Sequence, residues 1–333
     1  MDTLSRLLSL FTIRTSLDTR CELSAPWSLD EPPSAPDSVP FHLVVEGDAL
    51  IDMPGRASVD LHAGDIVVLP GGSAHRLHAG AHAPSHRPAG PVVDLAPAGL
   101  LRRKGNAGDR PDTTILCGRF VFDDAARQTL FGALPPMMVV RGSRQDDFPN
   151  LHALVRLLQY ETDTERAGSS AVVVQLSGAL FALLLRAWLE GVDDASAVMS
   201  PGVFAVLADR RLGAALRKML ENPAHPWRVD ELAEACHMSR ATFARLFTRL
   251  CGMPPGDVLA QLRMALAARV LARGSRAVGD VALDVGYQSE AAFNRVFKRH
   301  YGVGPGGYRR SRQQSTGKNP GSTSRSIRVE PAV

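Results

Sequence analysis

A short pattern occurs twice in the C-terminal part of the chain, and it constrains the fold more than any other feature. Residues 239–247 and 289–297 each begin with serine and place Phe, an aliphatic residue and Phe at positions i, i+3 and i+4. Those positions lie on one face of a helix, and the serine stands where an N-cap belongs. A shorter apolar-periodic segment precedes each copy, at 229–235 and at 278–285. The pattern therefore predicts two helix-turn-helix units.

A helix that enters the major groove of DNA buries one face and presents polar side chains from its first turns. Arginine can contact guanine, asparagine can contact adenine, and a carboxylate can accept from cytosine, whereas cations farther along meet phosphates. The residues expected to face DNA are Ser239, Arg240, Thr242, Arg245, Arg249, Ser289, Glu290, Asn294, Arg295 and Lys298. The competing interpretation, a helical bundle with a solvated charged face, is disfavoured because both copies carry a serine cap and end in Gly plus Pro.

The two units are joined by a predicted helix over 257–272, which would be about 24 Å long at a rise of 1.5 Å per residue. Successive major-groove faces lie about 34 Å apart, so we expect the two second helices to enter neighbouring grooves on one side of the duplex. Charge supports this interpretation. Residues 207–333 hold 21 Lys and Arg against 10 Asp and Glu, whereas residues 1–206 hold 17 against 24. The basic half suits a polyanion, and the acidic half is expected to sense or to dimerise.

The N-terminal half has the pattern of a small β-barrel or sandwich. Short strands are predicted at 41–45, 49–53, 58–61, 66–69 and 113–122, separated by turns rich in Gly, Pro and Asp. Helices are expected at 4–13, 151–161 and 170–189. The apolar run 171–189 is long enough to span a membrane, but Gln175, Ser177 and Arg186 interrupt it. We therefore interpret it as a buried or dimer-forming helix and expect a cytoplasmic protein without membrane contact, whose cysteines are reduced.

The end of the second unit resembles a known family signature. Residues 282–289, followed by Phe293, Phe297, Lys298, Gly302, Pro305 and Tyr308-Arg309, resemble the AraC/XylS family of bacterial transcriptional regulators. The resemblance implies a helical domain that binds double-stranded promoter DNA and usually activates RNA polymerase. Such proteins are not enzymes, and the chain offers no paired acid and base.

Residues 64–75, which end in His75, resemble the second cupin motif, and His42 and Glu46 stand where the later part of the first motif belongs. Pro40 occupies the place of the first motif's leading histidine. Cupins that bind metal usually offer three histidines and a carboxylate, so no cofactor is expected. His42, Glu46 and His75 could still hold a divalent ion or contact a small ligand. The alternative is a set of internally hydrogen-bonded histidines. The histidines at 78, 82 and 86 are expected on the surface.

The four cysteines fall into two groups. Cys236 and Cys251 stand at core positions of helices and are interpreted as packing residues. Cys117 shares a strand face with Arg119, whose guanidinium is expected to lower the thiol pKa. Inert packing is the alternative for Cys117. Cys21 lies in the extended segment before the barrel, next to Arg20.

A second resemblance concerns the N-terminal half. Residues 1–8, Cys21, Pro26-Trp27, Phe41-His42, the motif at 64–75 and Leu116-Cys117-Gly118 resemble AraC-type regulators with a cupin sensor. Within that group the similarity is to activators that respond to reactive chlorine. It implies redox-active cysteines at Cys21 and Cys117, which oxidation would join as a disulfide.

The sequence thus predicts an α+β protein of two domains. A cupin-like barrel is expected over 1–145, a helical dimerisation and linker region over 146–200, a double helix-turn-helix domain over 203–311 and a disordered tail over 312–333. The predicted function is a DNA-binding regulator, an activator and homodimer, switched by oxidation of Cys21 and Cys117. The alternative is the same regulator switched by a small ligand or metal in the barrel.

Overall fold

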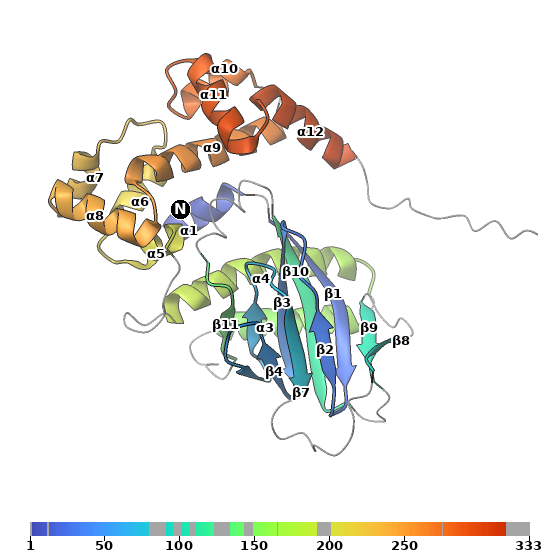
Figure 1. Ribbon diagram of the computed structural model, residues 1–333. Coiled ribbons are helices and arrows are strands. Elements are labelled where there is room, and N and C mark those ends of the chain that lie inside the picture. The colour runs from blue at the N-terminus through green and yellow to red at the C-terminus, as the bar shows by residue number, and fades with distance from the viewer. Residues whose placement is uncertain are drawn as a thin grey trace, which may run out of the picture.

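A β-rich N-terminal domain and a helical C-terminal domain make up the molecule in a computed structural model (Figure 1). The structure describes residues 2–11, 13–79, 91–95, 101–106, 111–122, 134–142, 149–164, 166–191, 201–274 and 276–317. Three predicted features lie outside the described residues: the surface histidines His82 and His86, residues 192–200 of the expected linker region, and residues 318–333 of the tail. This arrangement agrees with the predicted α+β fold.

The N-terminal domain contains two sheets that face each other. The larger sheet has the strand order β11-β6-β3-β10-β1-β9-β8, and all its pairings are antiparallel except that of β1 with β9. Its strands are β1 (Ile13–Leu23), β3 (Ser38–Glu46), β6 (Ile66–Val68), β8 (Val93–Leu95), β9 (Arg102–Gly105), β10 (Thr113–Phe122) and β11 (Met138–Val140). The smaller sheet has the order β2-β7-β4-β5. Its strands are β2 (Ser28–Glu31), β4 (Asp48–Asp52), β5 (Val59–His62) and β7 (His75–Ala79).

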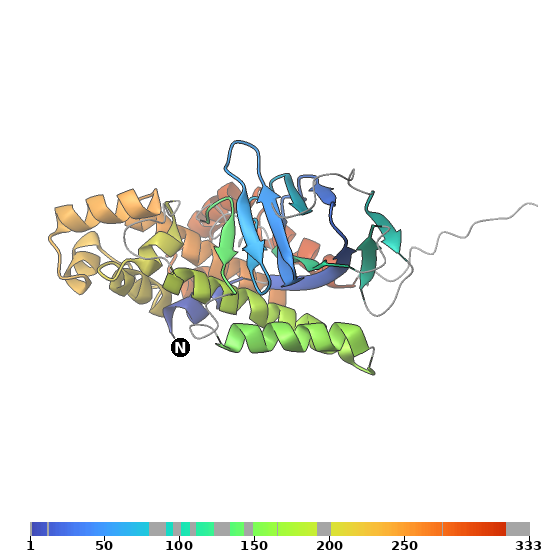
Figure 2. The same ribbon diagram turned by 90° about the horizontal axis from the view of Figure 1, so that it is seen from below.

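Alternation along β10 gives the larger sheet two buried faces. Ile115 and Cys117 point between the sheets, where a core of Leu, Ile and Val side chains fills the barrel. Leu116 and Phe120 point outward against the helix pair α3 (Pro149–Thr164) and α4 (Ser169–Gly191). The rings of Phe120 and Phe181 meet edge to face at 5.0 Å. Figure 2 shows the two helices side by side beneath the strands.

Helix α4 is the predicted apolar helix. By length and composition it could cross a membrane, and it is the one such helix in the described part of the chain. One face of α4, with Leu180, Leu184 and Leu185, is buried against the sheet. Val172 and Val174, in its first two turns, are exposed. This is how a helix packs at the edge of a protein core, as the sequence interpretation expected.

The C-terminal domain consists of eight helices in its described residues. They are α5 (Val203–Ala208), α6 (Gly213–Glu221), α7 (Val229–Ala235), α8 (Arg240–Cys251), α9 (Pro255–Arg273), α10 (Val278–Asp284), α11 (Glu290–Tyr301) and α12 (Pro305–Gly317). The pairs α7–α8 and α10–α11 are the two predicted helix-turn-helix units, and α9 joins them. Arg263 of α9 donates at 2.7 Å to the carbonyl of Pro223, in the segment that leads into α7, and its guanidinium lies over the Tyr287 ring of the second unit.

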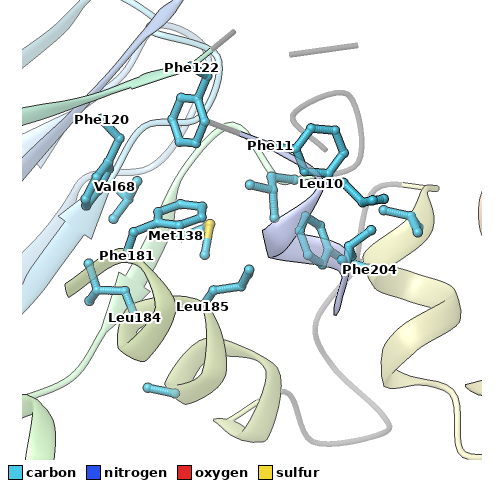
Figure 3. Close-up of a cluster of buried hydrophobic side chains, with 14 of the residues drawn as sticks. Leu10, Phe11, Val68, Phe120, Phe122, Met138, Phe181, Leu184, Leu185 and Phe204 are labelled. Atoms are coloured by element: carbon cyan, nitrogen blue, oxygen red, sulfur yellow. The ribbon is translucent and has the colours of Figure 1, made fainter. Parts of the chain in front are cut away.

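The N-terminal helix α1 (Thr3–Ser9) lies against the helical domain. It contacts α6, and Arg269 of α9 donates to the Ser9 carbonyl at the end of α1. Figure 3 shows Leu10 and Phe11, which follow α1, beside Phe204 of α5. All three belong to one buried cluster that also includes Phe120 and Phe181. The outer core of the N-terminal domain is therefore continuous with the core of the first helix-turn-helix unit, whereas α10 and α11 bury a separate cluster.

Several predicted boundaries need correction. The helix predicted over 4–13 ends at Ser9, and β1 begins at Ile13 because the β-branched residues Ile13 and Thr15 enter the sheet. The tail predicted to be disordered from 312 is helical to Gly317, and the Arg312 guanidinium covers the Tyr308 ring at 5.1 Å. The sequence prediction missed β7, β8, β9 and β11.

Candidate functional site

The first helix of interest, α8, has the geometry of a DNA-reading helix. The Ser239 hydroxyl accepts from the Thr242 N–H at 3.2 Å, and Gly252 ends the helix in the left-handed region at φ 77°. Phe243, Leu246 and Phe247 are buried, as expected. The predicted DNA-facing side chains of this unit are all exposed: Ser239, Arg240, Thr242, Arg245 and Arg249.

The helix α11 repeats this geometry. The Ser289 hydroxyl accepts from the Ala292 N–H at 3.2 Å, and Gly302 ends the helix at φ 74°. Phe293 and Phe297 are fully buried, while Val296, predicted to be internal, is only half-buried. The predicted DNA-facing residues Ser289, Glu290, Arg295 and Lys298 are exposed, and Asn294 is half-buried.

The two turns differ in length by one residue. The Met238 N–H donates to the Ala233 carbonyl, and the Tyr287 N–H donates to the Ala282 carbonyl in the same way. Donor and acceptor are five residues apart in both turns. Ser239 follows Met238 directly, whereas Gln288 stands between Tyr287 and Ser289, so Gln288 is the extra residue. The two reading helices therefore leave their turns differently and present non-identical surfaces.

Ion pairs on this surface are weak and easily exchanged. The Arg240 Nε lies 3.6 Å from Asp230 of α7, and both side chains are largely exposed. Exposed pairs of this kind contribute little to stability. Arg240 can therefore leave Asp230 for a phosphate or a base edge at little energetic cost.

The N-terminal domain brings Cys21 and Cys117 together. In the β1–β10 pairing Cys117 stands opposite Thr19, two residues from Cys21. Diagonal neighbours of this kind lie on the same face of a sheet, within reach of each other. The two thiols lie close enough for Cys21 to be the main cause of the pKa shift of Cys117. Cys21 is 1% exposed, whereas Cys117 is half-buried, and both line a cleft of about 270 Å³ at the barrel mouth. All four cysteines are free.

Cys117 also begins a chain of polar contacts across the barrel. Its Sγ lies 3.0 Å from His42 Nδ1 on β3, and His42 Nε2 lies 2.8 Å from His75 Nε2 on β7. His75 Nδ1 lies 2.9 Å from the Ser73 carbonyl. The sequence had grouped His42 and His75 as ligand candidates and had not connected them with the cysteines.

The predicted effect of Arg119 on Cys117 is wrong. Arg119 is half-exposed and donates to Asp18 at 2.6 Å, and it is not among the groups that shift the pKa of Cys117. The hydrogen bond with Cys21 and burial instead raise the pKa of Cys117 well above its usual value, because both favour the neutral thiol. Glu31 acts in the same direction, and Lys104 of β9 opposes it. Glu31, Ser73 and Lys104 are functional candidates that the sequence prediction missed; the basic run 102–104 beside the barrel was the available signal.

The predicted ligand set His42, Glu46 and His75 is not assembled. Glu46 is exposed at the far end of β3 and pairs with Thr114, whereas His42 and His75 are buried in contact. In the described residues no group of three or more His, Cys, Asp or Glu side chains is placed to share a metal ion. Burial and the neighbouring His75 lower the pKa of His42 to about 3, so its ring is neutral. The interpretation as internally hydrogen-bonded histidines fits these contacts.

The remaining sequence candidates serve as structure. Cys236 and Cys251 are buried in the helical domain, where burial raises the pKa of both thiols, that of Cys251 to about 11. His78, expected on the surface, is half-buried on β7, with its Nε2 3.1 Å from Asp52.

Comparisons with known proteins agree with this division. A family model described as cupin matches residues 2–190, and one described as helix-turn-helix domain matches residues 232–311. The RCS-specific HTH-type transcriptional activator RclR of Escherichia coli (strain K12) is 32% identical over 93% of this chain and 97% of its own length. The HTH-type transcriptional regulator MtrA of Neisseria gonorrhoeae is 32% identical over 93% of this chain and 98% of its own. The DNA-binding domain of AdpA, crystallised with a target DNA, is 30% identical over 33% of this chain and all of that chain, with a TM-score of 0.32.

Proposed function

Because the chain belongs to the AraC family of DNA-binding transcriptional regulators and carries a cupin domain at its N-terminus, we propose that it is a transcriptional activator switched by oxidation of Cys21 and Cys117. The observation that carries the proposal is the pair of cysteines on one face of the sheet, both lining one cleft. The inducer is a reactive chlorine species, and the partners are double-stranded promoter DNA and RNA polymerase. A regulator with free thiols works in the reducing cytoplasm.

The reactants of the oxidation are hypochlorous acid and the two thiols. The Cys117 sulfur, the more exposed one, takes the chlorine and water is released. The Cys21 sulfur then displaces chloride, and the S–S bond forms. Two thiol protons are lost, one into water and one to the medium. Two electrons pass from the sulfurs to chlorine, which leaves as chloride. Reduction by a cellular dithiol restores both thiols.

The route to the DNA-binding domain runs along β1. A disulfide needs Cα atoms roughly 4.4–6.8 Å apart, whereas diagonal sheet neighbours start at about 7–8 Å, so bond formation draws β1 toward β10. The pairing is already irregular between Leu17 and Thr19, where β1 can yield. The same strand leads back to α1, whose end is held by Arg269 of α9. Movement of β1 therefore changes the contact between α1 and the helical domain.

We further propose that the active form is a homodimer joined through α3 and α4. The support is their exposed apolar side chains: Leu157, Tyr160, Val172 and Val174. Arg20, next to Cys21, pairs with Asp163 of α3, so the redox site also contacts the proposed dimer helices.

The test is promoter binding by fluorescence anisotropy with and without stoichiometric hypochlorite. For the wild type we expect the affinity to change at least about fivefold, as allosteric coupling typically gives, and to return with dithiothreitol. Cys21→Ala and Cys117→Ala should not respond, while the matched control Cys236→Ala should respond as wild type. Mass spectrometry should find the Cys21–Cys117 cross-linked peptide. A Cys21→Ala variant that still responds would overturn the proposal.

The second candidate is the same regulator switched by a small ligand. The cleft beside Cys117 supports it, because its lining includes Arg102 and Lys104, which suit an anionic group. This candidate predicts a thermal shift with ligand and the same response in wild type and Cys21→Ala.

A further inference from the structure

Hydrogen-bond logic fixes the protons along the contact chain from Cys117 to Ser73. The Ser73 carbonyl can only accept, so His75 Nδ1 carries a hydrogen and donates to it. Since Nδ1 carries the hydrogen, Nε2 is the atom of His75 that accepts, and His42 Nε2 is the donor in that contact. Neutral His42 is left with Nδ1 as an acceptor, and this atom faces the Cys117 thiol at 3.0 Å. Every donor in the chain points away from Cys117 and toward His75.

We propose that His42 and His75 form a proton relay that removes the thiol proton of Cys117 while its sulfur reacts. The inference rests on the proposed redox function and assigns positioning residues to it. The thiol proton passes to His42 Nδ1, and the His42 Nε2 proton passes to His75 Nε2. No heavy atom needs to move: the thiol hydrogen turns from Cys21 to His42 Nδ1, and the heavy atoms of both contacts already lie within hydrogen-bond distance.

The two ends of the relay open on different cavities. Cys117 and His42 line the 270 Å³ cleft, and His75 lines a second cavity of about 540 Å³. Glu31 lines both and is the direct partner of His75 in the β2–β7 pairing. The second cavity also holds Asp30, Asp52 and Arg76, of which Arg76 is paired with Asp30. Three carboxylates and one guanidinium line this cavity, so the surroundings on this side of His75 carry a negative formal charge.

The surroundings of Cys117 explain why a relay is needed. The hydrogen bond with Cys21 and burial hold the pKa of Cys117 well above its usual value, with Glu31 adding to this and Lys104 opposing it. Few molecules therefore carry the reactive thiolate at neutral pH. His42 is too buried to keep a charge, because burial and His75 lower its pKa to about 3. If His42 passes the proton on to His75, the thiolate of Cys117 can form although its pKa is raised, and no charge stays on the buried His42.

Atoms and electrons balance over the whole sequence. Cys117 sulfur takes Cl from hypochlorous acid, and the departing hydroxide becomes water by taking one proton from the medium. The relay holds the Cys117 proton and returns it to the medium from His75. Cys21 sulfur then displaces chloride and gives up its own proton. The net change is two thiols and hypochlorous acid to one disulfide, water, chloride and one proton.

The experiment measures the alkylation rate of Cys117 by iodoacetamide against pH, in the full chain, by mass spectrometry. His75→Gln keeps an acceptor for His42 but cannot take a proton. We expect the wild-type rate to fall only slightly from pH 9 to pH 7, and the His75→Gln rate to fall about tenfold per pH unit, so that the two differ at least about tenfold at pH 7. The two profiles should converge at high pH, where hydroxide removes the proton.

His42→Asn is the second variant, because its amide can accept the thiol hydrogen bond but not the proton, and it should match His75→Gln. His78→Gln, on the same strand as His75, is the control and should match wild type. A variant rate lower by a constant factor at every pH, or equal to wild type throughout, would overturn the relay. Failure of the redox function looks different: hypochlorite would leave DNA affinity unchanged while the alkylation profiles still separate.

Discussion

At the scale of single residues, the reactivity of Cys117 is set by the register of three strands. Cys117 pairs with Thr19 of β1 on one side and with His42 of β3 on the other. A slip of one residue in β1 would turn Cys21 to the opposite face of the sheet, against the helices. The thiol pair and the histidine contact therefore exist only because both pairings hold.

The first prediction concerns the thiol itself. Cys21→Ala removes the hydrogen bond that contributes most to the raised pKa of Cys117, so that pKa should fall, although burial keeps it above the usual value. Since a lower pKa means more thiolate at a fixed pH, alkylation of Cys117 at pH 8 should become faster than in the wild type. Cys251→Ala should leave the rate unchanged. A slower or equal rate in Cys21→Ala would contradict the assigned cause.

The second prediction uses two glycines. A Cβ at Gly118, next to Cys117, would lie 2.4 Å from the Ser16 carbonyl and 2.5 Å from the Phe41 ring. Gly118→Ala should therefore destabilise the protein by about 1–3 kcal/mol, the usual cost of overpacking. Gly178 of α4 has no such neighbour, so Gly178→Ala should stabilise by up to about 1 kcal/mol through helix propensity. Urea denaturation measures both, and equal effects would refute the steric explanation.

At the scale of helices and strands, predictability followed the strength of local signals. The two helix-turn-helix units were predicted because a serine cap, a Phe-containing stripe and a terminal glycine repeat in the sequence and in the structure. The strands β3 to β6 and β10 were predicted from alternation and turns. In contrast, β9 has the charged sequence Arg-Arg-Lys-Gly, which does not have the pattern of a strand. It is a strand because it pairs with β1, which is distant in the sequence.

The candidate site was predictable in its members and not in its connections. The resemblance supplied Cys21, Cys117, His42 and His75. The contact between His42 and Cys117 depends on β3 and β10 pairing across 75 residues of chain, and that between His42 and His75 joins the two sheets. Long-range pairings of this kind form only in the assembled barrel, so the sequence could not show them. For the same reason Glu46 was grouped with His42 and His75, although it pairs with Thr114 at the other end of β3.

The third prediction tests a helix cap. Ser239→Ala leaves the Thr242 N–H without its acceptor, which should cost about 1 kcal/mol and loosen the first turn of α8. Promoter affinity should fall with stability because that turn carries Arg240. Thr248→Ala, exposed later on α8, is the control and should leave both within about 0.5 kcal/mol. Thermal unfolding and anisotropy are the measurements, and a harmless Ser239→Ala would show that the cap is dispensable.

At the scale of the whole molecule, charge and apolar surface are separated. The residues expected at DNA lie on α8 and α11, whereas α3 and α4 carry the exposed Leu157, Tyr160, Val172 and Val174. The long α4 joins these two regions through its buried face, which packs in the same cluster as α1 and α5.

The fourth prediction concerns assembly. Val174 is 54% exposed on α4, and Val174→Glu would place a charge in the proposed dimer interface. We expect the dimer dissociation constant to rise at least about tenfold in sedimentation, with folding unchanged by circular dichroism. Val303→Glu makes the same exchange at a 46% exposed site in the helical domain and should not affect assembly. If both variants sediment as wild type, the interface lies elsewhere.

The way α9 holds the two reading units has a consequence for the promoter. Arg263, at the middle of this single helix, holds the segment that leads into the first unit at Pro223 and covers Tyr287 of the second unit, so the units keep one mutual orientation. DNA completes a turn in about 10–10.5 base pairs. Inserting about five base pairs between the half-sites would turn one of them to the opposite side of the duplex, out of reach of its helix. We therefore expect operators of this regulator to vary in base sequence far more readily than in spacing.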